Sequence, residues 1–262
     1  MALYLTMNKK VVVVVPTYNE KGNIVLLVEK LCSILKLING YDFSILVVDD
    51  NSPDGTAAAV RMLQEKHKNL FLLTGNKEGL GKAYLRGFSH AVEKMDAAIL
   101  LVLDADFSHD LEKIPMFFEK IGAGYDFVIG TRYTKGGSIP AQWGIERKIF
   151  SILGNIVVRV ILWHYRIYDW TSGFRAFAKK YFVGAAEHMP RYSGYTFNVA
   201  FLHQAIHQGA KIYEVPFHYI DRTRGESKIV PKEYIISLLT YLIKSRIMEL
   251  FHCSRSNSVK TI

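Results

Sequence analysis

Short apolar runs alternate with longer amphipathic segments through the first half of the chain. The runs are rich in β-branched residues and have the length of buried strands; they are Val11–Val15, Phe43–Val48, Leu70–Thr74, Ala98–Leu103 and Phe127–Ile129. The segments between them show helical spacing; they are Gly22–Leu37, Thr56–Lys66, Gly81–Lys94 and Leu111–Ile121. Alternation of strands and helices at this spacing predicts βαβ units, and therefore a Rossmann-like α/β fold with a mostly parallel sheet flanked by helices.

The second half of the chain is less regular. We expect a helix, a strand, a helix, a strand and a last helix, at Ile145–Tyr165, Gly173–Ala178, Thr196–Gln208, Ile212–Tyr219 and Lys232–Phe251. The first and the last of these helices are amphipathic, each with a thin polar stripe on a mostly apolar surface. No linker interrupts the chain, so we expect a catalytic domain over residues 1–228 and a C-terminal amphipathic segment over residues 229–262.

Composition limits the class of protein without choosing a function. Half of the 262 residues are hydrophobic and 22% are charged, as in a globular protein with a sizeable core. A net charge of +9 would attract nucleic acid, anionic lipid or phosphorylated small molecules. The longest uncharged apolar stretches, Ile149–Val158 and Tyr234–Ile243, have ten residues each, whereas a membrane-spanning helix needs about 20. We therefore expect no transmembrane helix, in a protein that is soluble or lies on a membrane surface.

A pair of carboxylates follows the fourth predicted strand. In parallel sheets, ligands bind beyond the carboxyl ends of the strands, which is where Asp104 and Asp106 stand. Residues two apart on an extended segment point the same way, so both carboxylates can converge on one cation. Hard oxygen ligands suit Mg²⁺ or Mn²⁺ that bridges to substrate phosphates. The alternative is a solvated acidic turn, but the position directly after a buried strand favours a metal site.

Other polar residues at strand ends suit a nucleotide and its phosphates. Asp50 could accept hydrogen bonds from a base or a ribose, and Tyr18 could stack on a base. Basic residues follow the fifth strand and the late strand; they are Arg132, Arg222 and Lys228. Arginine is suited to bidentate phosphate contacts, although a solvated basic loop is the alternative for this group.

Eight segments, taken in order, resemble the glycosyltransferases of family 2, and within them the polyprenyl-phosphate (dolichol-phosphate) mannose synthases. They are PTYNE (16–20), VVDDNSPDGT (47–56), GLGKAYLRG (79–87), DADFSH (104–109), GTRY (130–133), TSGFRA (171–176), GYTF (194–197) and DRTRGESK (221–228). Each motif is modest alone, but eight in order are specific. The resemblance implies a GT-A fold and metal-dependent transfer of mannose from GDP-mannose to dolichyl or another polyprenyl phosphate, with inversion at the sugar.

The resemblance also implies roles for individual residues. The nucleotide sugar would contact Pro16, Tyr18, Glu20, Val48 and Asp50. The metal ion and the diphosphate would be held by Asp104, Ala105 and Asp106, with Ser108 as a further metal ligand. Phosphates of the donor or the acceptor would be bound by Arg132, Arg222 and Lys228, which with Asp106 form the expected catalytic set. A prenyl acceptor implies work at the cytoplasmic face of a membrane, with the C-terminal amphipathic helices at the bilayer surface.

The chain departs from the family pattern at two places. Asp110-Leu111 stands where relatives often have a proline or histidine, and Ala200 stands where they commonly have a glutamate. The second departure puts any role assigned to that glutamate in doubt. A phosphate monoester has a second pKa of about 6, so the acceptor is largely ionised at neutral pH and needs no general base to become a nucleophile.

Several other functions share single features of this sequence. A nicotinamide oxidoreductase would share the Rossmann-like sheet, but Gly79-Leu80-Gly81 lacks the third glycine of GxGxxG and follows the third strand, not the first. A nucleic-acid binder would use the positive charge but needs no paired carboxylates. An inactive binding-only relative, suggested by Ala200, and a prenyl-phosphate hexosyltransferase with another donor such as UDP-glucose are the alternatives within the family.

Overall fold

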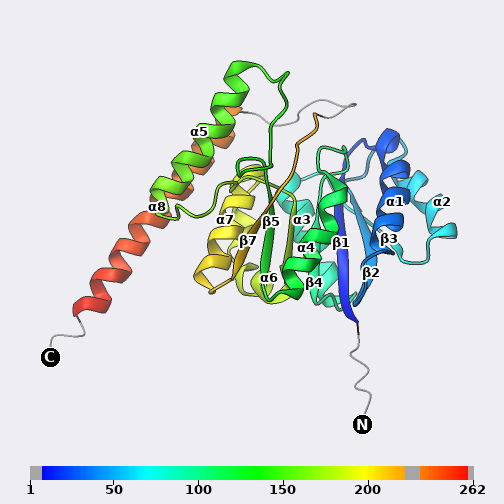
Figure 1. The fold of residues 1–262 in the computed structure, drawn as a ribbon, viewed down its shortest axis with the longest axis horizontal. Coiled ribbons are helices and arrows are strands. Elements are labelled where there is room, and N and C mark those ends of the chain that lie inside the picture. Colours follow the sequence, from blue (N-terminus) through cyan, green and yellow to red (C-terminus); the bar gives the residue numbers. More distant parts are fainter. Residues whose placement is uncertain (1–7, 222–230, 259–262) are drawn as a thin grey trace, which may run out of the picture.

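The computed structural model describes residues 8–221 and 231–258. Within them, one sheet of seven strands has the order β3-β2-β1-β4-β6-β5-β7 (Figure 1). The strands are β1 (Lys9–Thr17), β2 (Tyr41–Asp49), β3 (Leu70–Thr74), β4 (Ile99–Val102), β5 (Phe127–Thr131), β6 (Arg175–Ala178) and β7 (Ile212–Pro216). Strand β6 runs antiparallel to both β4 and β5, whereas the other pairings are parallel. The expected α/β class with a mostly parallel sheet is confirmed.

Helices cover both faces of the sheet. The helical segments are α1 (Lys21–Leu35), α2 (Thr56–Lys66), α3 (Leu80–Glu93), the 3-10 turn η1 (Leu111–Lys113), α4 (Ile114–Gly122), α5 (Ile145–Ile161), α6 (Lys179–Ala185), the 3-10 turn η2 (Met189–Arg191), α7 (Gly194–His207) and α8 (Pro231–Ser258). One apolar core lies between the sheet and α3, α6 and α7, and the other lies between the sheet and α1, α2 and α4. Alternate valines of β1 enter the two cores, as expected for a strand that is buried on both faces.

The expected elements are present, with differences where local pattern was weak. Helix α6 was missed, because a helix of seven residues is too short to show a clear helical period. The last expected strand ends three residues early, at Pro216. The strand expected from Gly173 begins at Arg175, because the residues before it form a loop that side-chain hydrogen bonds hold in place.

Helices α5 and α8 lie side by side at one end of the molecule, away from α1 and α2 (Figure 1). One face of α8 joins the core through Leu238, Tyr241 and Leu242, which are at most 6% exposed. The division into residues 1–228 and 229–262 stays a prediction, but this helix packs on the same core as the sheet. Over the described parts of the chain, no helix combines the length and the apolar character that crossing a bilayer requires.

Gly87 shows how closely α3 approaches the sheet. A Cβ atom at this position would lie 2.8 Å from a methyl group of Val14 and 2.8 Å from one of Val48. Since carbon atoms that are not bonded to each other do not come this close, either the helix or the strands must move to admit a side chain. This contact matters for function because Val48 is directly followed by the acidic residues at the end of β2.

We predict that Gly87→Ala lowers the free energy of unfolding by about 1–3 kcal/mol, the usual cost of overpacking a core. Gly154→Ala in α5 is the matched control, because nothing lies within 4 Å of the added Cβ. That change should stabilise the protein by about 0.5–1 kcal/mol through helix propensity. Denaturant unfolding of both variants checks this, and equal effects in the two would contradict the close approach of α3 to β1 and β2.

Candidate active site

Polar residues gather at the edge of the sheet where the parallel strands end. Strands β2, β1 and β4 are neighbours and run in one direction, so the loops after them lie next to each other. Strand β6 is reversed, which brings its amino end to the same edge. This edge therefore holds the two loops expected to bind the nucleotide, the expected metal ligands and the loop Asp169–Phe174 that leads into β6.

The loops after β1 and β2 are joined by hydrogen bonds. The Thr17 hydroxyl donates to the Asp49 carboxylate at 2.9 Å. Farther along, the backbone N–H of Asn19 donates to the Ser52 hydroxyl at 2.9 Å, and that of Glu20 donates to the Thr56 hydroxyl at 3.0 Å. These bonds fix one loop against the other. The expected nucleotide ligands lie on this joined pair of loops, with Pro16 in register with Val48; the set is Pro16, Tyr18, Glu20, Val48 and Asp50.

Two of these residues have cationic neighbours that were not anticipated. Asp50 is nearly buried and forms an ion pair with Arg86 of α3. Burial raises the pKa of the Asp50 carboxyl, and Arg86 acts against that rise. The Nζ atom of Lys77 lies 3.7 Å from the centre of the Tyr18 ring. A base that stacks on Tyr18 must therefore use the other face of the ring or displace Lys77.

The Asp104-Ala105-Asp106 segment begins two residues after β4 ends. Asp104 is partly exposed, whereas Ala105 and Asp106 are 3% and 6% exposed. The chain turns sharply at Phe107, whose φ is 60°, and the backbone N–H of Ser108 then donates to Asp106 at 3.0 Å. Ser108 itself is fully buried. The turn thus holds Asp106 in one orientation and puts Ser108 directly behind it.

His109 is part of this site and was missed as a functional residue, although it ends the DADFSH motif. Its Nδ1 accepts a hydrogen bond of 3.1 Å from the backbone N–H of Asp104, so the proton of the neutral ring is on Nε2. The ring stacks on Phe174 at 5.0 Å between centroids. Burial lowers the pKa of His109 to about 4, despite attraction to Asp106. His109 is therefore neutral near pH 7 and does not neutralise the charge of the two aspartates.

The donor set at this turn fits a hard divalent cation. Asp104 and Asp106 lie two residues apart just after β4, and the His109 imidazole 3.7 Å from the Asp104 carboxylate is neutral. Oxygen ligands of this kind suit Mg²⁺ or Mn²⁺, and two close carboxylates repel each other unless a cation lies between them. Asp104 and Asp106 are the residues that would hold such an ion, with Ser108 behind them.

Arg132 follows β5 and is engaged by a residue that the sequence did not single out. Its Nε and one terminal nitrogen each donate to the Asp169 carboxylate at 2.7 Å, and the same terminal nitrogen donates to Thr171 at 2.8 Å. The Asp169 side chain is fully buried and that of Arg132 is 8% exposed. Burial alone would lower the pKa of Arg132, but Asp169 outweighs it, so the pKa is raised and the guanidinium stays charged.

Arg175, at the start of β6, holds the loop Asp169–Phe174 from the other side. Its guanidinium is almost completely buried and donates to the carbonyl oxygens of Trp170, Ser172 and Asn198 at 2.6–2.7 Å. Burial lowers its pKa to about 10, which still leaves it charged near neutral pH.

Ala200 lies on α7, three residues after Phe197, and is fully buried in the apolar core.

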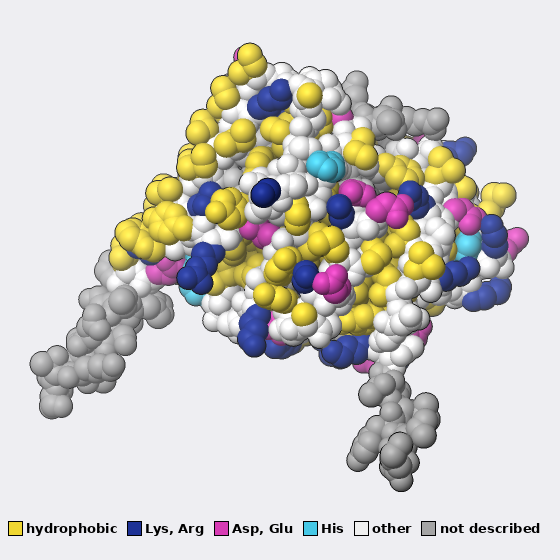
Figure 2. Space-filling model, in the orientation of Figure 1, with side chains coloured by type: hydrophobic (Ala, Val, Ile, Leu, Met, Phe, Trp, Pro, Cys, Tyr) yellow, Lys and Arg dark blue, Asp and Glu magenta, His cyan; other side chains and the backbone are white. Residues whose placement is uncertain are grey.

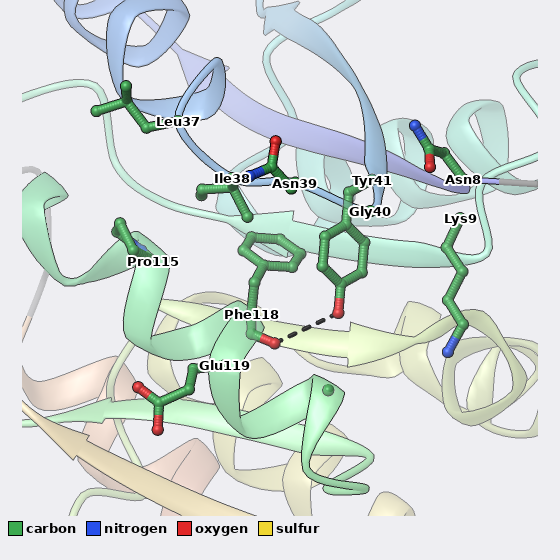
Figure 3. Close-up of a pocket in the computed structure, with 11 residues that line it drawn as sticks. Asn8, Lys9, Leu37, Ile38, Asn39, Gly40, Tyr41, Pro115, Phe118 and Glu119 are labelled. Carbon is green, nitrogen blue, oxygen red and sulfur yellow. Dashed lines mark hydrogen bonds between the residues drawn. The ribbon is translucent and has the colours of Figure 1, made fainter. Parts of the chain in front are cut away.

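Two expected phosphate ligands, Arg222 and Lys228, lie outside the described residues. The other expected site residues lie at one edge of the sheet, as their order after successive strands suggested. A cavity of about 550 Å³ lies elsewhere, between the start of β2 and α4, where the Tyr41 hydroxyl donates to the Phe118 carbonyl (Figure 3). It is at the amino ends of β1 and β2, so it is separate from the carboxylate site.

Comparisons with known proteins agree with this architecture. The family model described as "Glycosyl transferase family 2" matches residues 12–182. The polyprenol monophosphomannose synthase of Mycolicibacterium smegmatis is 32% identical over 223 residues, which cover 84% of this chain and 81% of that protein. The dolichol-phosphate mannosyltransferase of Pyrococcus furiosus is 37% identical over 224 residues, which cover 85% of this chain but only 60% of that protein.

Solved structures show the same fold at low sequence identity. The glucosyl-3-phosphoglycerate synthase of Mycobacterium tuberculosis, crystallised with Mn²⁺, UDP and glucosyl-3-phosphoglycerate, has a TM-score of 0.63 and 16% identity, covering 91% of this chain and 80% of that chain. The mannosyl-3-phosphoglycerate synthase of Rubrobacter xylanophilus has a TM-score of 0.64 and 16% identity, and the match covers 93% of this chain and 75% of that chain. The expected GT-A fold is confirmed. The chain belongs to glycosyl transferase family 2 and is a glycosyltransferase.

Proposed function

We propose that this enzyme transfers mannose from GDP-mannose to dolichyl or another polyprenyl phosphate, with inversion at the sugar and dependence on Mg²⁺ or Mn²⁺. The observation that carries the proposal is the placement of Asp104 and Asp106 beside the joined loops after β1 and β2. The names of the two similar mannosyltransferases support the sugar and the acceptor. The Mn²⁺ and UDP in the structurally similar synthase support the metal.

In this proposal the joined loops bind the nucleoside, and Asp104 and Asp106 bind the metal ion and the diphosphate. When bound, the ion would supply neutralisation of the charge that develops on the leaving diphosphate. Asp106 is buried and held in place by the Ser108 N–H, whereas Asp104 is partly exposed and therefore the more accessible of the two carboxylates. Neutral His109 fixes the Asp104 backbone without competing as a cation.

The acceptor needs no general base from the protein in this scheme. A phosphate monoester is already an anion near neutral pH, so the protein has to hold two anions together. Ala200, which is fully buried in the apolar core, offers no ionisable group, in keeping with this scheme. Among the described residues, the side-chain hydrogen bonds of Arg132 to Asp169 and Thr171 use Nε and one terminal nitrogen, and in this proposal the other terminal nitrogen contacts a phosphate. Arg222 and Lys228 complete the proposed set of cations.

We also propose that α5 and α8 bring the enzyme to the cytoplasmic surface of the membrane that holds the acceptor. More than half of the exposed large hydrophobic residues in the described chain lie on these two helices. Figure 2 shows hydrophobic side chains along the edge that the helices form. Lys148, Arg159, Lys244 and Arg246 add positive charge to them, which suits anionic headgroups. A long prenyl chain is insoluble in water, so its phosphate is met at the bilayer surface.

A second prediction tests the sugar donor and the metal together. Purified enzyme is given a panel of radiolabelled nucleotide sugars with a short-chain polyprenyl phosphate, and GDP-mannose should give the highest rate. Asp106→Asn should lower kcat by about 100-fold or more, because charge neutralisation by the metal contributes several kcal/mol to the transition state. Asp110→Asn is the control, since Asp110 lies in the same loop and caps η1, a task that asparagine also performs.

The outcomes separate the parts of the proposal. If transfer from UDP-glucose were faster than transfer from GDP-mannose, the proposed donor would be wrong but the proposed metal role would stand. Full activity in excess EDTA, or a near-normal rate for Asp106→Asn, would contradict the metal role. If none of the donors gave sugar transfer to polyprenyl phosphate, the proposed acceptor would be wrong.

A third prediction concerns the buried ion pair of Arg132 and Asp169. Asp169→Ala should lower the free energy of unfolding by about 3–5 kcal/mol, because it leaves the Arg132 guanidinium buried without its partner. Glu119→Ala in α4 is the control: the Glu119 side chain is 64% exposed and its ion pair with Lys120 lies at the surface, so the loss should be much smaller. Denaturant unfolding compares the two. A similar small loss in both would show that Arg132 is readily hydrated and not held by Asp169.

A fourth prediction tests the proposed membrane contact with exposed residues of α5. Leu153 and Val160 are each 51% exposed, and changing both to Asp should weaken co-sedimentation with anionic vesicles at least about tenfold, from the loss of apolar burial. Leu26→Asp with Met62→Asp is the matched control, on the exposed faces of α1 and α2. Activity on a water-soluble short-chain acceptor should persist in both variants. Equal vesicle binding by the two pairs would rule out α5 as the contact.

A further inference from the structure

Three side chains of types that can bind metal ions converge between α7 and α8. His203 and His207 are four residues apart on α7 and so lie on one face of it, and Glu249 reaches them from α8. None of the three belongs to the carboxylate site after β4 or to its loops. The proposed transfer reaction makes no use of them.

The distances within this His-His-Glu cluster match those around a tetrahedral metal ion. The Nε2 atoms of His203 and His207 are 3.1 Å apart, and they lie 2.9 and 3.2 Å from Oε1 of Glu249. Ligands at about 2.0–2.1 Å from a tetrahedral zinc ion are separated by roughly 3.3 Å, so the three atoms form nearly one face of such a tetrahedron. All three atoms can present lone pairs to the space between them.

The surroundings orient the cluster as outer partners of a metal site do. His203 is 2% exposed, and its Nδ1 is 2.8 Å from the Tyr241 hydroxyl, which leaves Nε2 for the cluster. Arg246 donates to the other carboxylate oxygen of Glu249 at 3.2 Å. Oε1 of Glu249 is buried and receives no hydrogen bond of good geometry from the described residues, although two imidazole nitrogens are close to it. A buried acceptor in this position is what a cation would satisfy.

We propose that His203, His207 and Glu249 bind a Zn²⁺ ion that fastens α8 to α7. Two imidazoles and one carboxylate suit zinc better than magnesium, which prefers oxygen ligands. A fourth position is open to water, because the His207 side chain is 47% exposed. The ion would link the C-terminal part of α8 to the catalytic core, beyond the turns that Leu238, Tyr241 and Leu242 already bury. This site is independent of the transfer reaction and of its metal.

The full chain, stripped with EDTA and dialysed, is the sample for the test. Zn²⁺ is added in the presence of excess Mg²⁺, so that the aspartate site is occupied by the harder ion, and bound zinc is measured by mass spectrometry after desalting. Wild-type protein should retain about one equivalent. His207→Ala and Glu249→Gln should bind zinc more than about 100-fold more weakly, since even a change of an outer partner costs up to that factor.

Controls separate this site from others in the chain. His188→Ala removes an exposed histidine outside the cluster and should keep full zinc binding. Asp106→Asn should also keep it. Co²⁺ in place of zinc should give the intense visible absorption of a four-coordinate ion in wild type, and the absorption should disappear in His207→Ala. Added zinc should raise the melting temperature of wild type and of His188→Ala but not that of His207→Ala.

The proposal fails if wild type retains no more zinc than His207→Ala under these conditions. It also fails if zinc binding is lost in Asp106→Asn and kept in Glu249→Gln, because the zinc would then be at the aspartates. The half-exposed position of His207 makes a folded variant the expected result, and the melting temperature without zinc checks that directly.

Discussion

Strands β1 and β4 are buried on both faces and leave no room for charge in their central parts. Alternate residues of β1 and β4 enter opposite apolar cores, so a polar side chain in either strand would be buried without water. Charged residues are therefore confined to the ends of these strands. Because β2, β1 and β4 are parallel neighbours, their carboxyl ends meet at one edge, and the acidic and basic residues collect there. The arrangement of the candidate site follows from this burial.

Charges at that edge are held by partners instead of by water. Asp50 is paired with Arg86, Arg132 with Asp169, and Arg175 with three backbone carbonyls. Groups that are fixed in this way before a substrate binds need not be reorganised when charge develops on a diphosphate. An arginine that already faces a carboxylate contributes less net charge to a phosphate, so for Arg132 we expect position and orientation to matter more than attraction at long range.

The parts of the site that could be predicted from sequence depend on local pattern. Asp104 and Asp106 were predictable because an apolar strand directly precedes them, and the loops after β1 and β2 were predictable for the same reason. Asp169 was not, because its role depends on the reversal of β6, which places the loop before that strand next to Arg132. Apolar runs show that a strand exists but not its direction. Arg86 lies on α3 in a motif that was noted, yet its contact with Asp50 depends on how α3 packs over β2. The cluster of His203, His207 and Glu249 joins two helices that are distant in sequence, and only the spacing of its two histidines was visible beforehand.

Helix α8 is apolar on two faces: one packs in the core and the other is exposed. Leu238, Tyr241 and Leu242 fill the core beside α7, whereas Ile236, Leu239 and Ile243 point outward with 40–67% exposure. Deleting everything after residue 228 would remove both faces at once and open the core, so loss of membrane binding in such a truncation would say little about the outer face. Substituting only the outward residues tests the exposed face without opening the core. The inner face packs α8 on the same core as the sheet, so a bilayer contact made by α5 and α8 would also set the orientation of the strand-end site relative to the membrane.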